Sequence, residues 1–321
     1  MRRRWIALLA GILVLAGALF VAGPWYLSGP LKRDTAFIVP DGSTLASVAA
    51  KLQQEGAIGS ARGFRLRARL FGGGAPIKAG EFMLPKGASL ATILARLQGD
   101  EILRRFVTVP EGMPSIMVYE RLMAQPYLTG PIPVPAEGSI LPDSYDFQRG
   151  ETRAAVLARM EAAMQRVLIQ AWAKRAPGIA VKTPQEALTL ASIVEKETGK
   201  PTERQMVAGL YSNRLRQGIM LQADPTIIYP ITKGKPLGRR IRQSEIQAVN
   251  GYNTYTMVGL PQGPITNPGR ASIEAVLDPA KTDALYMVAD GTGGHAFAST
   301  LQQHNDNVAK WFAIRRARGE L

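Results

Sequence analysis

Apolar residues recur at every third or fourth position in several parts of this chain of 321 residues, which predicts amphipathic helices. The clearest runs are residues 152–175, 183–198, 203–218 and 299–318. The second run opens with Thr183-Pro-Gln-Glu, which supplies an N-cap, a proline at the first helical position and a glutamate at the third. A strand is predicted at ALYMVAD (284–290), between loops rich in Gly, Pro and Asn. This half of the chain is therefore predicted to be α+β.

The N-terminal half contains a repeat of strand, tight turn and helix. PDGSTLASVAAKLQ (40–53) matches PKGASLATILARLQ (85–98), and a weaker copy, PEGMPSIMVYERLM, begins at Pro110. Each copy follows a short apolar stretch, and its Pro-x-Gly forms a turn ahead of a helical pattern. Because the first two copies are too short to fold separately, we expect them to share one small sheet. Such units resemble LysM-like modules, which bind N-acetylglucosamine polymers; a generic α/β spacer explains the pattern equally well.

Three arginines at residues 2–4 precede a run from Trp5 to Leu27 that contains no charged residue. About 20 apolar residues can span a bilayer as a helix, and the arginines predict a cytoplasmic N-terminus. The alternative is a cleaved signal peptide, but the run is longer than a usual signal core and no clear A-x-A site follows it. We therefore expect a single-pass anchor in the cell inner (plasma) membrane, with the residues after 30 on the periplasmic side.

These patterns predict four parts of the chain. They are a cytoplasmic tail at residues 1–4, a transmembrane helix at 5–27, a LysM-like repeat region at 30–130 and a catalytic domain at 137–321. The last boundary falls in AQPYLTGPIPVPAEG (124–138), a stretch rich in Pro and Gly.

The composition narrows the possible chemistry. The chain has no cysteine, which excludes disulfides, thiolate metal sites and a cysteine nucleophile. Its two histidines are too few for a multi-histidine metal centre. The net charge of +14 indicates an anionic partner, such as an acidic wall polymer or a membrane surface. Nucleic acid is disfavoured, because no basic segment with interleaved aromatics stands out and the predicted side of the membrane is extracytoplasmic.

Two glutamates stand near the end of the second predicted helix, in LASIVEKETGK (190–200). At about 100° per residue, Glu195 and Glu197 point some 200° apart. Glu197 continues the apolar stripe of Ile193 and Val194, whereas Glu195 lies on the flank. A carboxyl group on an apolar stripe is costly unless it is paired or protonated, and a raised pKa suits a general acid. Alternatively, Glu197 meets solvent beyond the last buried turn or pairs with an arginine such as Arg214.

Other polar residues are concentrated in the same half of the chain. Amides, hydroxyls and aromatic rings in loops near one acid are typical of a sugar-binding cleft, although turn chemistry explains each residue alone. Asp224 is followed by Pro225, and the simplest interpretation of this pair is a turn. We therefore identify no second carboxylate beside Glu197. Together with Glu195, the residues that we assign to substrate binding are Asn213, Arg214, Gln222, Asp224, Tyr252, Asn253, Thr254, Tyr255, Asn267 and His295.

Five segments in fixed order resemble the endolytic murein transglycosylase family, also called YceG-like. They are EGSILPDSY (137–145), ASIVEKET (191–198), NRLRQGIMLQADPTIIY (213–229), YNTYTMVGLPQGPITNPG (252–269) and GGHAFASTLQQHN (293–305). With the anchor and the repeat region, the resemblance covers nearly the whole chain. The catalytic residue that it implies is the second glutamate of ASIVEKET, Glu197. Two departures in EGSILPDSY, an isoleucine and a serine, bear on subsite details.

The resemblance implies non-hydrolytic cleavage of the β-1,4 bond between N-acetylmuramic acid and N-acetylglucosamine in nascent peptidoglycan. The product is a 1,6-anhydro end, and its formation terminates strand elongation. No metal or cofactor is required, and the implied partners are peptidoglycan glycan strands and the cell-wall synthesis machinery. The alternatives are a non-catalytic peptidoglycan-binding protein and a hydrolytic muramidase, which would use two carboxylates.

Overall fold

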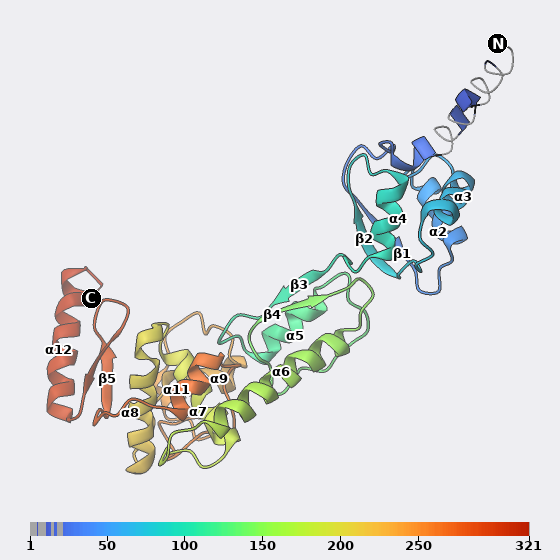
Figure 1. Cartoon of the computed structure of the whole chain (residues 1–321). Helices are drawn as coiled ribbons and strands as arrows, with labels where there is room; N and C mark the ends of the chain where they lie inside the picture. Colours follow the sequence, from blue (N-terminus) through green and yellow to red (C-terminus); the bar gives the residue numbers. More distant parts are fainter. Residues whose placement is uncertain (1–4, 6–10, 14–15, 18–21, 321) are drawn as a thin grey trace. The chain divides into compact units, whose positions relative to one another are not determined.

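The computed structural model describes residue 5, residues 11–13, 16–17 and 22–320, and these residues form an α+β fold of helices and two-stranded sheets (Figure 1). The chain divides into two compact units. The first contains the described residues up to Arg105 together with residues 146–150. The second contains residues 106–145 and the described residues from 151 onward.

The first unit is built around the first two copies of the repeat. Strands β1 (Thr35–Val39) and β2 (Gly80–Leu84) pair antiparallel, with Thr35 opposite Leu84 and Val39 opposite Gly80. Helices α2 (Leu45–Gln54) and α4 (Leu90–Gln98) follow these strands, so the prediction that both copies share one small sheet is confirmed. Gly42 and Gly87 make the turns at φ of 72° and 66°, a conformation that costs glycine little.

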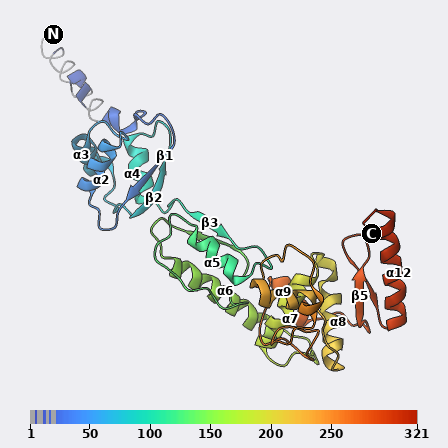
Figure 2. The same ribbon diagram turned by 180° about the vertical axis from the view of Figure 1, so that it is seen from behind.

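The core of this unit lies between the sheet and three helices, the third being α3 (Ala61–Phe71) (Figure 2). Its fully buried side chains include Phe37, Leu52, Phe64, Phe82 and Leu97. One carboxylate is also buried: Glu81, at 4% exposure, accepts hydrogen bonds from Arg105 and Arg149. Burial raises the pKa of Glu81, but the two guanidinium groups outweigh it and hold the pKa below its usual value.

The third copy of the repeat also has a strand and a helix. Strand β3 (Arg105–Thr108) forms a two-stranded sheet with β4 (Ser144–Phe147), and α5 (Ser115–Met123) follows the turn. The turn contains Gly112 at φ 71°. The long helix predicted from residue 152 is α6 (Arg153–Ala173), with Thr152 as its N-cap.

Two predicted helices form the centre of the second unit. The first is α7 (Pro184–Glu197), where Thr183 Oγ accepts from Glu186 N at 3.1 Å, as the capping pattern predicts. After the short 3-10 helix η1 (Pro201–Glu203), the second is α8 (Arg204–Arg216). The α7 side chains from Ala187 to Val194 are all buried.

The segment that we predicted as mostly loop contains three further helices, so that prediction is wrong in part. They are α9 (Asp224–Thr232), α10 (Gln243–Ile246) and α11 (Arg270–Leu277). Pro225 lies in the first turn of α9, where its missing N–H costs nothing. Helix α11 buries Ile273 and Val276 in the core that also contains α7 and α8 side chains. Tertiary burial therefore outweighs the weak local pattern.

The C-terminal elements are β5 (Tyr286–Ala289), β6 (His295–Ala298) and α12 (Leu301–Ala317). The strands pair antiparallel, with Tyr286 opposite Ala298 and Ala289 opposite His295. The predicted strand and last helix are thereby confirmed.

Much of the predicted membrane-spanning run, residues 5–27, lies outside the described residues. In the part of the chain that the structure describes, no helix has both the length and the apolar character needed to cross a membrane.

Candidate active site

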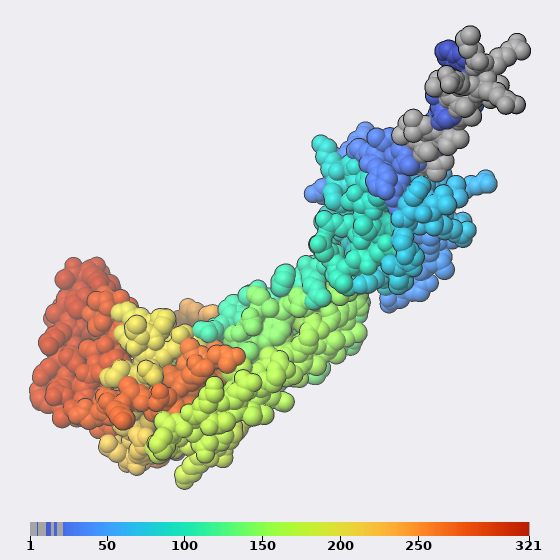
Figure 3. Space-filling view, viewed as in Figure 1, coloured from blue at the N-terminus to red at the C-terminus, as the bar shows by residue number. Residues whose placement is uncertain are grey.

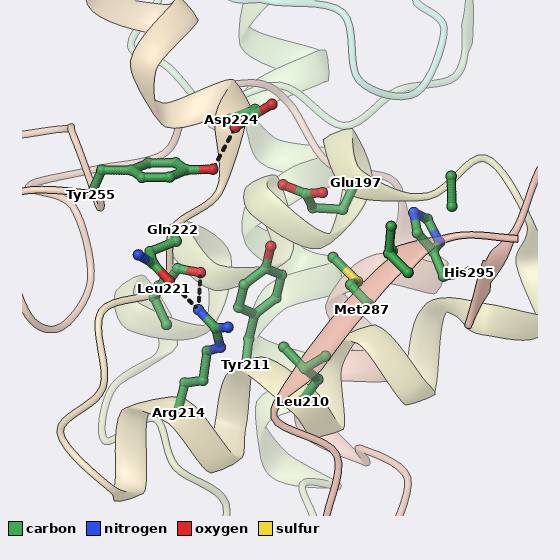
Figure 4. A pocket seen from close by; sticks show the side chains of 12 residues that line it. Glu197, Leu210, Tyr211, Arg214, Leu221, Gln222, Asp224, Tyr255, Met287 and His295 are labelled. Atoms are coloured by element: carbon green, nitrogen blue, oxygen red, sulfur yellow. Dashed lines mark hydrogen bonds between the residues drawn. The ribbon is translucent and has the colours of Figure 1, made fainter. Parts of the chain in front are cut away.

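A pocket of about 240 Å³ lies in the second unit, where α7, α8, the start of α9 and β5 meet (Figure 4). Segments far apart in the sequence therefore supply its wall. The residues that line it are Glu197, Leu210, Tyr211, Arg214, Leu221, Gln222, Asp224, Tyr255, Met287, Val288, Ala289 and His295.

Glu197 is the last residue of α7, one turn beyond the fully buried Ile193 and Val194. Burial raises the pKa of its carboxyl group to about 7; a hydrogen bond with Tyr211 lowers the pKa and the charge of Asp224 raises it. Its Oε1 atom is buried and has no hydrogen-bond partner among the described residues. The carboxyl group is therefore protonated over a useful fraction of molecules near neutral pH, and one oxygen is free to act on a ligand.

Tyr211 interacts with this carboxyl group. It comes from α8, is 2% exposed, and points its hydroxyl toward Glu197 (Figure 4). Burial raises the pKa of Tyr211 well above its usual value, and the nearby Glu197 raises it further. Tyr211 therefore stays protonated and can donate to Glu197 throughout the physiological pH range.

Asp224 is a second carboxylate on the pocket wall. It lies in the first turn of α9 and accepts a hydrogen bond from Tyr255 Oη at 2.6 Å. The expectation that no second carboxylate stands beside Glu197 therefore needs correction: the turn that begins α9 brings Asp224 into the same pocket.

Arg214 lines the pocket but does not form an ion pair with Glu197 among the described residues. Its guanidinium group donates to the carbonyl oxygens of Met220, Leu221 and Leu285 and to Gln222 Oε1. These bonds join α8 to the segment before α9 and to the start of β5. Arg214 and Gln222 thus shape the pocket wall, and among the described residues Arg214 supplies no opposite charge in an ion pair with Glu197.

His295 reaches the opposite part of the wall from β6. Its Nδ1 atom lies 2.9 Å from Glu203 Oε2, and its backbone N–H donates to Glu203 Oε1 at 3.2 Å. Burial raises the pKa of Glu203, but these hydrogen bonds and the nearby Lys200 bring it below its usual value. Glu203 therefore fixes the orientation of the imidazole ring at the pocket.

Several residues assigned to substrate binding lie elsewhere in the second unit. Asn253, Thr254 and Asn267 are fully buried. Asn253 donates to three backbone carbonyls, at Glu245, Ile246 and Ala248. The structure does not bring these three side chains to the pocket wall; they brace the surrounding loops from within.

The hydroxyl of Thr254 contacts Ala223 N and Thr226, and so fixes the start of α9. Asn267 donates to Met113 O and Ser115 Oγ.

Asn213 and Tyr252 are not pocket-lining residues either. Asn213 donates to Thr282 O and Ala284 O, which ties α8 to the segment before β5. The ring of Tyr252 packs against Tyr229 with centroids 4.7 Å apart. These contacts indicate structural roles for the side chains in the folded unit.

Glu195 points away from the pocket, as the helix geometry predicts. Its Oε2 atom accepts from Gly269 N at 2.9 Å and from Ser272 Oγ at 2.7 Å, at the start of α11. Its side chain is 6% exposed, with Arg204 3.8 Å away. It is therefore a buried capping group rather than a residue on an open flank, and the structure does not bring it to the pocket wall.

Six pocket residues were not predicted from the sequence: Leu210, Tyr211, Leu221, Met287, Val288 and Ala289. The three β5 residues carry no chemical signature, because a strand that forms part of a wall reads like any other apolar strand. Tyr211 had a weak signal, since it lies three residues before Arg214 on the same predicted helix.

The fold and pocket define an α+β protein with a protonatable glutamate at the end of a helix, one of whose carboxyl oxygens is buried. A model of the YceG-like family matches residues 37–310, and the chain belongs to that family. The similar solved structures include the 2.6 Å crystal structure of a YceG-like protein from Listeria monocytogenes. It has a TM-score of 0.53 and 26% sequence identity, and the match covers 86% of this chain and 99% of that one.

Curated relatives match a little over half of this chain. The chain is 32% identical over 181 residues to the endolytic murein transglycosylase of Bacillus subtilis (strain 168), covering 56% of this chain and 49% of the relative. It is 35% identical over 181 residues to the endolytic murein transglycosylase of Streptococcus pneumoniae serotype 2 (strain D39 / NCTC 7466), covering 54% and 32%. The matches thus span half or less of the length of these relatives.

Proposed function

We propose that this protein is an endolytic lytic transglycosylase that cleaves the β-1,4 bond between N-acetylmuramic acid and N-acetylglucosamine in nascent peptidoglycan. The observation that carries the proposal is Glu197, whose burial raises its pKa to about 7 and whose Oε1 atom has no hydrogen-bond partner among the described residues, within a polar pocket. Membership of the YceG-like family and the names of the curated relatives support the same activity.

In the first step, protonated Glu197 donates its proton to the glycosidic oxygen as the bond from that oxygen to C1 of the muramoyl unit breaks. In the second step, the resulting carboxylate takes the proton of the muramoyl 6-hydroxyl while O6 bonds to C1. The acid is regenerated, no water enters the product, and the strand ends in 1,6-anhydromuramic acid. One carboxyl group thus serves both steps.

Tyr211 and Asp224 set the protonation of this acid. The hydroxyl of Tyr211 stabilises the carboxylate that forms after proton donation, whereas the charge of Asp224 favours the protonated state before it. Tyr211 and Asp224 line the pocket together with His295, Gln222 and Tyr255. We propose that these five polar side chains contact the hydroxyl and N-acetyl groups of the sugar. No metal or cofactor takes part in the proposed reaction.

The proposed location is the cell inner membrane. The uncharged run from Trp5 to Leu27 would be a single transmembrane helix, with residues 1–4 cytoplasmic and the catalytic domain at 137–321 periplasmic. The repeat region at 30–130 would be a LysM-like module that follows the anchor. This position would hold the pocket near newly made glycan strands and the cell-wall synthesis machinery.

The test is the chemical form of the product. The full chain, given un-crosslinked glycan strands, should release fragments that are about 18 Da lighter than hydrolysis products, because no water is added across the bond. Glu197→Gln keeps the size of the side chain and removes its proton, so activity should fall by about 10²–10⁴-fold. Glycan binding that survives Glu197→Gln, together with no strand cleavage by the unsubstituted chain, would instead favour a non-catalytic peptidoglycan-binding protein.

A hydrolytic muramidase is the second candidate, because Asp224 stands on the same pocket wall and could activate water. In that case the fragments would have reducible muramic acid ends and would incorporate heavy oxygen from labelled water. Asp224→Asn would then abolish the reaction at every pH, whereas in the proposed transglycosylase it should lower the pKa of Glu197 and reduce the rate without abolishing cleavage.

A further inference from the structure

Helix α3 of the first unit has a basic and apolar outer face. Its sequence, ARGFRLRARLF, contains four arginines and no acidic residue. Phe64 and Ala68 are buried, so they attach the helix to the unit. On the outer side, Leu66 and Leu70 are 56% and 59% exposed, one helical turn apart.

Arginines flank these exposed leucines. Arg62 and Arg69 are exposed, Arg65 is partly exposed, and none of the three forms an ion pair among the described residues. Isolated exposed leucines are common on protein surfaces and need no explanation. Here two exposed leucines lie next to each other among arginines that form no ion pair with the described residues, and the need for a soluble surface does not account for this combination. We call Arg62, Arg65, Leu66, Arg69 and Leu70 the α3 outer face; α3 itself is light blue at the surface of the first unit in Figure 3.

The α3 helix contacts the segment that ends the uncharged N-terminal run. The Trp25 ring packs against Phe64 and Phe71 of α3, with centroids 6.4 Å and 5.9 Å apart. Next to Trp25, Tyr26 and Leu27 are 70% and 65% exposed. Exposed aromatic and basic residues at the end of an apolar run are typical of a membrane–water interface.

An apolar cleft of about 370 Å³ lies beside this contact. Leu27, Phe64 and Leu90 line it, with Ser60, the N-cap of α3, and Arg67 of the same helix. Apolar walls next to a basic helix suit the junction between the acyl chains and headgroups of a phospholipid.

We propose that the α3 outer face lies on the periplasmic surface of the membrane and binds anionic phospholipid headgroups. Leu66 and Leu70 enter the headgroup–acyl boundary, and the arginines contact lipid phosphates. The inference rests on the proposed anchor, because the contact of Trp25 with α3 would place this helix at the end of the membrane-spanning segment. Charge complementarity commits the face to an anionic lipid rather than to a neutral one.

The absence of cysteine from the chain allows a site-specific test. The full chain with Leu66→Cys is labelled with an environment-sensitive NBD fluorophore and inserted into nanodiscs, either of neutral lipid or with added phosphatidylglycerol. The NBD emission should shift to shorter wavelength, and lipid-borne quenchers should reach the probe, only with the anionic lipid. The matched control is Ile169→Cys on α6, also an exposed apolar helical position at 68%, whose probe should not respond.

A second variant tests the charge. Adding Arg62→Gln and Arg69→Gln to the Leu66→Cys chain should lower the ratio of lipid-bound to free probe, measured from fluorescence lifetimes, by roughly 30-fold. Each basic residue near an anionic leaflet contributes about a factor of five. Equal burial in both lipids, or burial that the arginine variants leave unchanged, would overturn the proposal.

A response to added glycan strands in place of lipid would also overturn it, because the face would then bind wall polymer. Co-elution of the chain with neutral nanodiscs measures the anchor separately. A silent probe on a chain that co-elutes therefore contradicts the α3 contact alone, whereas loss of co-elution contradicts the anchor and the contact that depends on it.

Discussion

Replacing Tyr211 by Phe tests whether the pocket sets the protonation of Glu197. The ring is 2% exposed and fills the same space in both residues, so the substitution removes only the hydroxyl that interacts with the Glu197 carboxyl group. This interaction lowers the pKa of Glu197, because it stabilises the carboxylate. Its removal should therefore raise the pKa above the wild-type value of about 7.

The magnitude follows from the strength of such a bond. A hydrogen bond to a charged group contributes about 1.5–3 kcal/mol, and one pH unit corresponds to about 1.4 kcal/mol. A general acid works only when protonated, so the rate should fall as pH rises through the pKa of Glu197. In Tyr211→Phe this alkaline limb should move to higher pH by on the order of one unit. The plateau rate should fall by about tenfold, because the carboxylate formed in the reaction loses its donor.

The assay is kcat/KM for glycan-strand cleavage between pH 5 and 9, because this ratio reports the free enzyme. The control is Tyr145→Phe, which removes a hydroxyl that donates to Leu141 O at 2.7 Å and does not line the pocket. Its alkaline limb should stay in place. A lower plateau in Tyr211→Phe without movement of the limb would refute the reasoning, since it would indicate a merely structural tyrosine.

Two further variants test the buried carboxylates outside the pocket. Glu195→Gln should lower the free energy of unfolding by about 1–3 kcal/mol, because it weakens the charged acceptor at the start of α11. Its activity should fall far less than that of Glu197→Gln. Equal loss of activity in the two folded variants would contradict this expectation. Glu81→Gln should lower the stability of the first unit by up to about 3 kcal/mol at pH 7, measured by urea unfolding. The pKa of Glu81 is lowered in the folded state, so its contribution to the free energy of unfolding is present above about pH 4.5 and is lost as pH falls through the folded pKa. Glu81→Gln should therefore weaken the dependence of stability on acid pH. An unchanged dependence of stability on pH would contradict this reasoning.

Local patterns were sufficient for much of the fold. The capping sequence at Thr183 and the three-four spacing after it predicted α7, because both signals depend only on neighbours in the chain. The Pro-x-Gly turns likewise predicted the strand-turn-helix units, since Gly42 and Gly87 adopt the positive φ that such turns require. Helices α9 and α11 were missed because burial against distant segments, not local propensity, stabilises them.

The sequence by itself determined that Glu195 and Glu197 point to different sides of α7, because helical periodicity depends only on their positions along the helix. Only the tertiary structure decided what surrounds Glu197. It brings Tyr211 from α8 and Asp224 from α9 to the same carboxyl group, and it places Asn253 inside the protein, away from the pocket. A pKa depends on burial and on charges within a few ångströms, and these come from residues that are distant in the sequence.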